Sequence, residues 1–159
     1  MVTLRFTSLS VILFVISGCG LVSKSPHYNP EIGERAVKIA IGYKGTPYKY
    51  RGTTPKGFDC SGFTYYVYKK AGFETPRSSK AQYSFGRKIS KSDLKNGDLV
   101  FFTRWGFIGK LFSPGHVGIY IGNSKFIHAP SNGGKVRVDS LNDVYWKRNF
   151  KGARRIIVS

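Results

Sequence analysis

Residues 57–72 read GFDCSGFTYYVYKKAG, and this stretch decides how the rest of the chain is interpreted. A glycine-rich turn region ends at Asp59, and a mostly apolar run then continues to Gly72, a residue that can end a helix. Asp59 is therefore a predicted N-cap, with Cys60 in the first turn of the helix. Unpaired backbone N–H groups and the positive end of the helix dipole lower the pKa of a cysteine in that position. Cys60 is a candidate nucleophile, although a small buried hydrophobe is the usual role of a free cysteine.

The composition favours one globular domain with a large positive charge. The 159 residues are 41% hydrophobic and 15% aromatic, and 26 Lys and Arg against 8 Asp and Glu give a net charge of +18. Such a charge favours polyanionic partners and opposes self-association, so we expect a monomer. The basic residues are scattered and form no nucleic-acid module, so no nucleic acid is expected as a partner. Because the first twenty residues look like an export signal, cell-wall polymer and anionic lipid headgroups are the predicted polyanions.

The N-terminal residues resemble a bacterial lipoprotein export signal. Arg5 gives a basic start, residues 9–16 form an apolar segment too short to span a membrane, and Ile16-Ser17-Gly18-Cys19 resembles a lipobox. We expect residues 1–18 to be a signal peptide, Cys19 to carry a lipid anchor, and 19–30 to be a tether before a domain at 31–159. With Gly20 rather than aspartate after the cysteine, the resemblance implies an outer-membrane lipoprotein facing the periplasm. A disulfide between Cys19 and Cys60 is the alternative.

The order of the remaining elements predicts an α+β fold, with N-terminal helices packed on an antiparallel sheet. Asn29-Pro30-Glu31 has the residues of a helix start, and Gly42 can end that helix. Ser78 is the predicted cap of a second, short helix that runs to Tyr83. Most later segments read as β strands: 99–102 as a buried strand, and 136–138 and 153–158 as further strands. Between the last two, residues 141–146 read as a short helix or turn.

Two of the three histidines lie on a predicted β-hairpin, while His27 lies in the tether. A three-residue loop at 122–124 sets His128 opposite Gly118 and diagonal to His116, about 7 to 8 Å apart along the backbones. A two-residue loop would place the histidines on opposite faces. Each histidine alone is best explained as a core or rim residue, but the registered pair indicates a site.

The residue types in this site suit two kinds of chemistry. Cys60, His116 and His128 are possible zinc ligands, but a single cysteine in the first turn of a helix favours a nucleophile with its base. We therefore expect neither a metal nor another cofactor. Tyr48 lies in a loop from which it can reach the thiol, although core packing is the default for a tyrosine. Arg77 can bind a substrate carboxylate or simply lie at a helix end.

Five separated motifs occur in an order that resembles the NlpC family of cell-wall cysteine peptidases, including its small lipoprotein members. They are Asp59-Cys60-Ser61-Gly62-Phe63, Asn96-Gly97-Asp98-Leu99-Val100-Phe101-Phe102, His116-Val117-Gly118-Ile119-Tyr120-Ile121-Gly122, Ile127-His128-Ala129 and Tyr145-Trp146. The resemblance runs from Glu31 to the C-terminus. It implies a papain-like fold and hydrolysis of peptide bonds in peptidoglycan stem peptides, with peptidoglycan as the partner.

The resemblance also implies roles for individual residues. Cys60 would be the nucleophile, His116 the base and His128 the residue that orients the base. Tyr48 would lend its hydroxyl to the oxyanion site. Asp59 and Ser61 would contact the substrate.

The loop at 103–115 is longer than the usual pattern of the family, and we interpret it as a wall or lid of the substrate groove. Two other functions fit the same residues. One is a catalytically inactive peptidoglycan-binding module on the same fold. The other is an amidase or acyl transferase acting on lipid or another amide.

Overall fold

The structure is a computed structural model that describes residues 29–103 and 114–156. The predicted signal peptide, Cys19 and most of the loop at 103–115 lie outside the described residues. Within the described ranges, no helix has both the length and the apolar character to cross a membrane.

Helix α1 spans Pro30–Gly42 and begins as the sequence predicts. The side chain of Asn29 accepts a hydrogen bond from the backbone N–H of Glu31, and Pro30 occupies the first helical position. Gly33, Ala36, Val37 and Ala40 form the buried face of this helix. Small residues on that face allow close packing, and an added Cβ on Gly97 would lie 2.5 Å from the Cα of Gly33.

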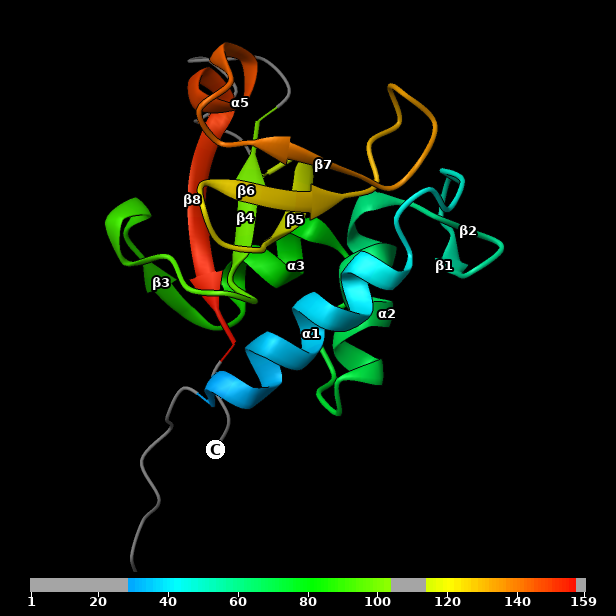
Figure 1. The fold of residues 1–159 in the computed structure, drawn as a ribbon, viewed down its shortest axis with the longest axis horizontal. Helices are drawn as coiled ribbons and strands as arrows, with labels where there is room; N and C mark the ends of the chain where they lie inside the picture. The colour runs from blue at the N-terminus through cyan, green and yellow to red at the C-terminus, as the bar shows by residue number, and fades with distance from the viewer. Residues whose placement is uncertain (1–28, 104–113, 157–159) are drawn as a thin grey trace, which may run out of the picture.

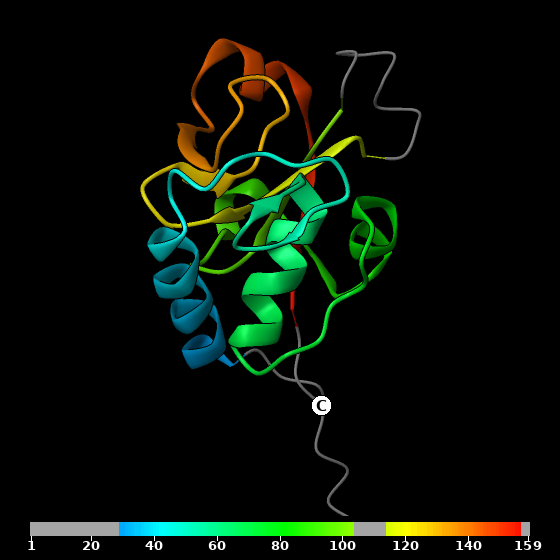
Figure 2. The ribbon, with the colours of Figure 1, turned by 90° about the vertical axis from the view of Figure 1, so that its right-hand side faces the viewer.

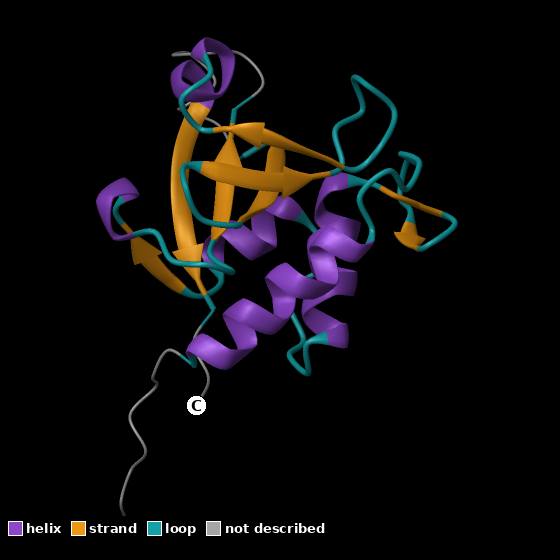
Figure 3. Ribbon diagram, in the orientation of Figure 1, coloured by secondary structure: helices purple, strands orange, loops and turns teal. Residues whose placement is uncertain are grey.

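Helix α2 spans Cys60–Lys70, with Asp59 as its N-cap. Both helices lie against one face of a sheet whose strands are arranged in the order β3-β8-β4-β5-β6-β7 (Figures 1 and 3). Every neighbouring pair in that order is antiparallel. The α+β prediction is therefore confirmed. The strands of this sheet are β3 Arg87–Ile89, β4 Leu99–Phe102, β5 His116–Tyr120, β6 Lys125–His128, β7 Arg137–Ser140 and β8 Phe150–Arg155.

Shorter elements complete the described part of the chain: a small sheet of β1 Thr53–Thr54 and β2 Gly57–Phe58, helices α3 Ser79–Ser84 and α5 Val144–Asn149, and the 3₁₀ turn η1 Lys91–Asp93. The segment before Asp59 was expected to be turn-like, and β1 and β2 pair within it. Ser78 caps α3 as predicted, accepting a hydrogen bond from the backbone of Ala81.

Both faces of the central sheet are buried, which explains why β4 is apolar throughout. Leu99 and Phe101 point toward the helices, in one core cluster with Val117, Ile119 and Ile127. The alternate residues of β4, Val100 and Phe102, pack in a second cluster with Trp146 of α5. The two-residue period of a strand thus assigns every side chain of β4 to one of two cores.

Three boundaries near the C-terminus differ from the sequence prediction. Strand β7 begins at Arg137 and continues to Ser140, because Val136 exchanges backbone hydrogen bonds with residues 45 and 46. Helix α5 begins at Val144, after the turn in which a helix starting at 141 was expected. Strand β8 begins at Phe150, because a bulge lets its first residues pair with β4. Strand β3 was not predicted.

A buried ion pair joins the neighbouring strands β4 and β8 at one end of the sheet. Arg155, at the end of β8, binds both carboxylate oxygens of Asp98 at 2.8 and 2.7 Å, and both side chains are almost fully buried. Asp98 precedes β4, so the pair fixes the turn that starts this strand. The start of α1 and the end of β8 lie at one end of the molecule, and α5 and β7 lie at the other (Figures 1 and 2).

Candidate active site

The two histidines are brought together by the register of the β5–β6 hairpin. Ile119 pairs with Ile127 and Tyr120 with Phe126, so residues 122–124 form the three-residue loop that the sequence predicts. Gly122, Asn123 and Ser124 all have positive φ angles, which closes the loop in so few residues. His128 consequently lies opposite Gly118 and diagonal to His116.

Gly118 leaves space for the neighbouring strand β6 to pack closely. A Cβ added at this position would lie 3.1 Å from the Cβ of His128 and 2.7 Å from a ring carbon of Phe126. Nε2 of His116 lies 2.7 Å from Nδ1 of His128, within hydrogen-bond distance. The predicted contact between the two histidines is therefore confirmed.

The contact continues to a carboxylate. Nε2 of His128 lies 3.0 Å from Oδ2 of Asp139, on the neighbouring strand β7. His116 is partly exposed, whereas the side chain of His128 is completely buried. The three side chains form a line from the surface at β5, through β6, to β7.

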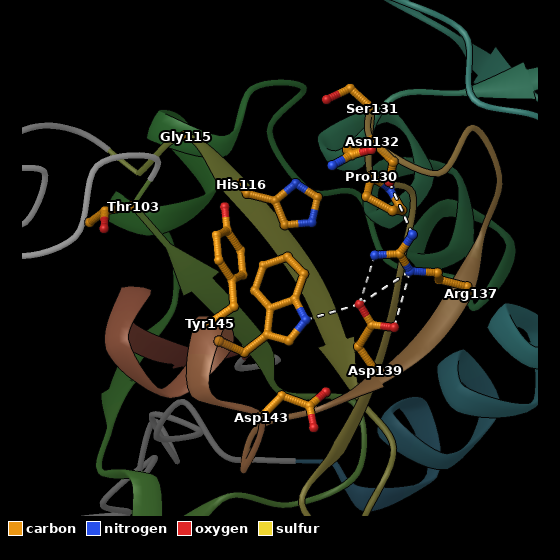
Figure 4. A pocket seen from close by; sticks show the side chains of 11 residues that line it. Thr103, Gly115, His116, Pro130, Ser131, Asn132, Arg137, Asp139, Asp143 and Tyr145 are labelled. Carbon is orange, nitrogen blue, oxygen red and sulfur yellow. Dashed lines mark hydrogen bonds and ion pairs between the residues drawn. The ribbon is translucent and has the colours of Figure 1, made fainter.

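Asp139 is held by two further donors (Figure 4). Nε of Arg137 donates to Oδ1 at 3.0 Å, and its Nη2 donates to Oδ2 at 3.1 Å. The indole Nε1 of Trp146 donates to Oδ2 at 2.9 Å. These donors come from β7 and α5, so the carboxylate joins the sheet to the helix that covers it.

The same surroundings shift the pKa of both ionisable partners. Burial lowers the pKa of His128, and the hydrogen bond and charge of Asp139 oppose this effect only in part. Burial raises the pKa of Asp139, but the hydrogen bonds from His128 and Arg137 outweigh it, and the net pKa lies well below the ordinary value. At neutral pH the pair is a neutral imidazole beside an ionised carboxylate.

Aromatic rings enclose the histidine pair. The indole of Trp146 stacks on His116, with ring centroids 5.6 Å apart and an interplanar angle of 26°. The same indole meets His128 edge-on at 5.0 Å. Phe102 and Phe126 pack beside them. The rings restrict the rotation of both imidazoles.

A cavity of about 700 Å³ opens beside His116 (Figure 4). His116, Trp146 and Tyr145 line one part of it, while Arg137 and Asp139 lie in another. The segment 130–132 and Thr103 complete much of the lining. The cavity places one face of the exposed imidazole within reach of a bound molecule.

The first turn of α2 is fixed by a polar network around Asp59. The Asp59 carboxylate accepts a hydrogen bond from the backbone N–H of Gly62 at 2.6 Å, which confirms the predicted cap. Arg77 donates to both Asp59 oxygens, at 3.1 and 2.7 Å, and to the hydroxyl of Ser61 at 3.0 Å. The structure therefore brings Asp59, Ser61 and Arg77 together, and gives the Arg77 guanidinium a carboxylate partner within the chain.

Cys60 is half-buried at the start of α2 and forms no disulfide within the described residues. It packs with Tyr48 against the core cluster on the helix side of the sheet. The backbone N–H of Tyr48 donates to Gly134 at 2.7 Å, which fixes the loop that carries the phenol ring. Convergence of the thiol and the Tyr48 hydroxyl on His116 stays a prediction from the sequence.

Sequence reasoning missed the role of Asp139, Arg137 and the indole of Trp146. Arg137 and Asp139 alternate on β7, and Arg137 is paired with His128 in the sheet, which brings the next residues of β7 beside the buried imidazole. A prediction of the register between β6 and β7 would have found them. No group of three or more His, Cys, Asp or Glu side chains suited to hold a metal ion occurs within residues 29–103 and 114–156.

The chain is similar to characterised bacterial proteins. It is 40% identical over 130 residues to the "Murein DD-endopeptidase MepS/Murein LD-carboxypeptidase" of Escherichia coli K12, covering 81% of this chain and 65% of that one. The chain thus spans slightly less than two thirds of that relative. It is 38% identical over 160 residues to the "Probable endopeptidase NlpC" of the same organism, covering 96% of this chain and 100% of that one.

Solved structures give the same result. The crystal structure of an NlpC/P60 family protein from Bacillus cereus superposes with a TM-score of 0.72 at 36% identity, covering 77% of this chain and 39% of that one. The NlpC/P60 family model matches residues 45–155, which contain all the site residues described above. The fold is the papain-like domain expected from the resemblance. On the sequence match, the fold and the arrangement of the histidines, the chain belongs to the NlpC/P60 family.

Proposed function

We propose that this protein is a peptidoglycan hydrolase that cleaves peptide bonds in murein stem peptides or cross-links by a cysteine mechanism. The observation that carries the proposal is the hydrogen-bonded His116–His128 pair beside an open cavity. The capped helix that begins at Cys60 supports it. Relatives named as murein endopeptidases make peptidoglycan the substrate class.

The proposed nucleophile is the thiolate of Cys60. The helix N-terminus favours this charge, and the Asp59 carboxylate is neutralised in part by Arg77. In the first step the sulfur attacks the scissile carbonyl carbon and the carbonyl π electrons move to its oxygen. The backbone N–H of Cys60 and the hydroxyl of Tyr48 donate to the resulting oxyanion.

His116 acts as base and then as acid in each half-reaction. It takes the thiol proton and then gives it to the leaving nitrogen as the C–N bond breaks, which leaves an acyl-enzyme on the sulfur. A water molecule then gives a proton back to His116 and attacks the thioester carbon. The carboxylic acid product departs, and the thiol is restored. His128 holds the imidazole plane of His116 throughout.

We also propose that the enzyme works as a lipid-anchored protein on the periplasmic side of the outer membrane. The lipobox-like residues 16–19 support this location, and the net charge of +18 would keep the enzyme near anionic wall polymer. Fatty-acid labelling of the expressed protein should be lost in Cys19→Ala. Equal labelling of the two proteins would exclude the anchor.

Digestion of purified cell wall tests the activity. The wild-type protein should release new muropeptides with free stem-peptide termini, and Cys60→Ala should release none, because the substitution removes the proposed nucleophile. Mass analysis of products from a defined cross-linked muropeptide would identify the cleaved bond. Alkylation at neutral pH would show whether Cys60 is reactive.

The alternatives give different results in the same assays. A binding module would bind the wall, leave muropeptide profiles unchanged and show an unreactive Cys60. An amidase or acyl transferase acting on other substrates would turn over an amide or ester without releasing stem-peptide products. Equal muropeptide profiles from wild type and Cys60→Ala would refute the proposed function.

A further inference from the structure

A carboxylate stands behind the histidine pair, and it determines where the ring protons lie. Asp139 lines part of the cavity and contacts His128 at 3.0 Å, and it is linked to the proposed base His116 through the His128 ring. The inference below rests on the proposed function, because it assigns Asp139 a part in that reaction.

The hydrogen-bond partners of Asp139 keep its carboxylate an acceptor. Arg137 donates to both oxygens, and the Trp146 indole, which has only a donor, also points at Oδ2. A proton on either oxygen would face one of these donors. The low pKa of Asp139 agrees with this arrangement. The remaining contact at Oδ2, from Nε2 of His128, must therefore be a donated N–H.

The protons of both histidines follow from that single donor. His128 is buried and neutral, so a proton on Nε2 leaves a lone pair on Nδ1. That lone pair lies 2.7 Å from Nε2 of His116, which must donate. In neutral His116 the lone pair is then on Nδ1, the ring nitrogen that does not face His128.

We propose that Asp139 is a positioning residue that, through His128, fixes His116 in the tautomer with its proton on Nε2 and its lone pair on Nδ1. In this form Nδ1 of His116 is the atom that accepts the thiol proton. The resulting imidazolium still donates from Nε2 to His128, and Asp139 remains ionised. The relay therefore orients the base without itself moving a proton.

The opposite tautomer would disable the base. If Nε2 of His128 lost its proton to Nδ1, that Nδ1 would donate to Nε2 of His116, whose own proton would move to Nδ1. The base would then present an N–H to the thiol instead of a lone pair. A carboxylate orients a catalytic imidazole in this way in serine proteases, where loss of its charge disfavours the productive tautomer.

Asp139→Asn replaces one acceptor oxygen by an NH₂ group at nearly constant volume. We expect kcat on a defined muropeptide to fall about 10- to 100-fold, as for other residues that orient a functional histidine, with KM little changed. Asp139→Glu keeps the acceptor charge and should recover part of the lost kcat. Thermal unfolding of each variant will report whether it folds.

A spectroscopic measurement separates tautomer control from simple support of the fold. The ¹⁵N shifts of labelled imidazoles distinguish protonated from unprotonated ring nitrogens, and in the wild type Nε2 of both His116 and His128 should be protonated. In Asp139→Asn the His128 signals should move toward the other tautomer. Asp143→Asn is the matched control. It removes the same charge at the same cavity, but the Asp143 carboxylate accepts a hydrogen bond from the backbone of Ser140 rather than from a histidine, so the tautomers should not change.

Two results would overturn the inference. One is a wild-type His128 with its proton on Nδ1. This measurement is made on the wild-type protein, so it does not depend on whether any variant folds. The other is a folded Asp139→Asn protein with unchanged kcat and unchanged tautomers. If Cys60→Ala is inactive while Asp139→Asn is fully active, only this inference fails. If Cys60→Ala is as active as the wild type, the proposed function itself fails.

Discussion

At the scale of single residues, the site depends on the side chain that Gly118 lacks. Its backbone lies in β5 directly opposite His128, and the Phe126 ring, the backbone oxygen of Ile127 and the Cβ of His128 border the space in which a Cβ would stand. The glycine has no positive φ angle here, so its role is to leave space rather than to adopt an unusual conformation. A small residue on one strand thus permits a functional ring on the next.

Gly118→Ala should both destabilise the protein and disturb the relay. The added methyl would lie 2.7 Å from a ring carbon of Phe126, 3.0 Å from the backbone oxygen of Ile127 and 3.1 Å from the Cβ of His128, so the Phe126 ring and strand β6 must shift in a closely packed core. Overpacking of this kind costs about 1 to 3 kcal/mol. Urea unfolding would measure the free energy, and the His116–His128 coupling would be followed by NMR.

The control for this prediction is Gly42→Ala at the end of α1, where an added Cβ meets nothing within 4 Å. Replacing a helical glycine by alanine stabilises by up to about 1 kcal/mol, so the sign of the effect should reverse. A Gly118→Ala protein as stable as the wild type would show that the hairpin opens to admit the methyl group.

At the scale of elements, α2 begins where Asp59 satisfies its first turn. The carboxylate accepts from Gly62, and Arg77 holds the carboxylate from the following segment. The packing around Gly62 is also close, because an added Cβ there would meet the backbone oxygen of Gly52. The orientation of this turn determines where the Cys60 thiol lies.

Asp59→Ala should lower the free energy of unfolding by about 1 kcal/mol through loss of the cap. Asp59→Asn keeps an oxygen that can accept from Gly62 and should retain most of this stability. Asn29→Ala removes the cap of α1 in the same way. Its cost in stability should be similar, but only Asp59→Ala should also change the rate at which Cys60 is alkylated. If Cys60 were alkylated at the same rate in Asp59→Ala, Asp59→Asn and Asn29→Ala, the cap of α2 would have no effect on the reactivity of the thiol.

The helix starts could be predicted from sequence because their signals are local. Asn29, Asp59 and Ser78 each bind a backbone N–H two or three residues further on, so the sequence contains both partners of each contact. The histidine pair could be predicted for a similar reason, since a three-residue loop fixes the register of the hairpin.

Asp139 could not be found in this way. Strand β7 is half-exposed along its whole length and has no apolar alternation, so its register against β6 has no local signal. The donors of Asp139 come from two elements, and Trp146 lies on a helix whose predicted position was a few residues too early. The prediction therefore contained the histidines but not the carboxylate behind them.

At the scale of the whole molecule, the relay makes stability depend on pH. The side chains that face His128 are Asp139 and Arg137 on β7, His116 on β5, Phe126 on β6 and Trp146 on α5. Burial lowers the pKa of His128 below the ordinary value, and its partners lower the pKa of Asp139. In both cases the unfolded chain binds protons at a higher pH than the folded protein does.

The free energy of unfolding should therefore decrease as the pH falls. For His128 the loss begins below about pH 6.5, the ordinary pKa of histidine, and for Asp139 it begins below about pH 4. Urea unfolding between pH 7.5 and 5 isolates the first contribution. His128→Gln should be less stable at neutral pH but should lose less stability over this interval. If the free energies of unfolding of the two proteins changed in parallel over this interval, the pKa of His128 would be the same in the folded and the unfolded chain, which would contradict the prediction.

The positions of the two ends of the described chain have a practical consequence. The start of α1 and the end of β8 lie on the side remote from α5 and β7, which border the cavity (Figures 1 and 2). A fluorescent protein or a solid support joined ahead of Asn29 would leave the mouth of the cavity facing outward. Immobilised molecules would then all have the same orientation, with the cavity facing an insoluble polymer.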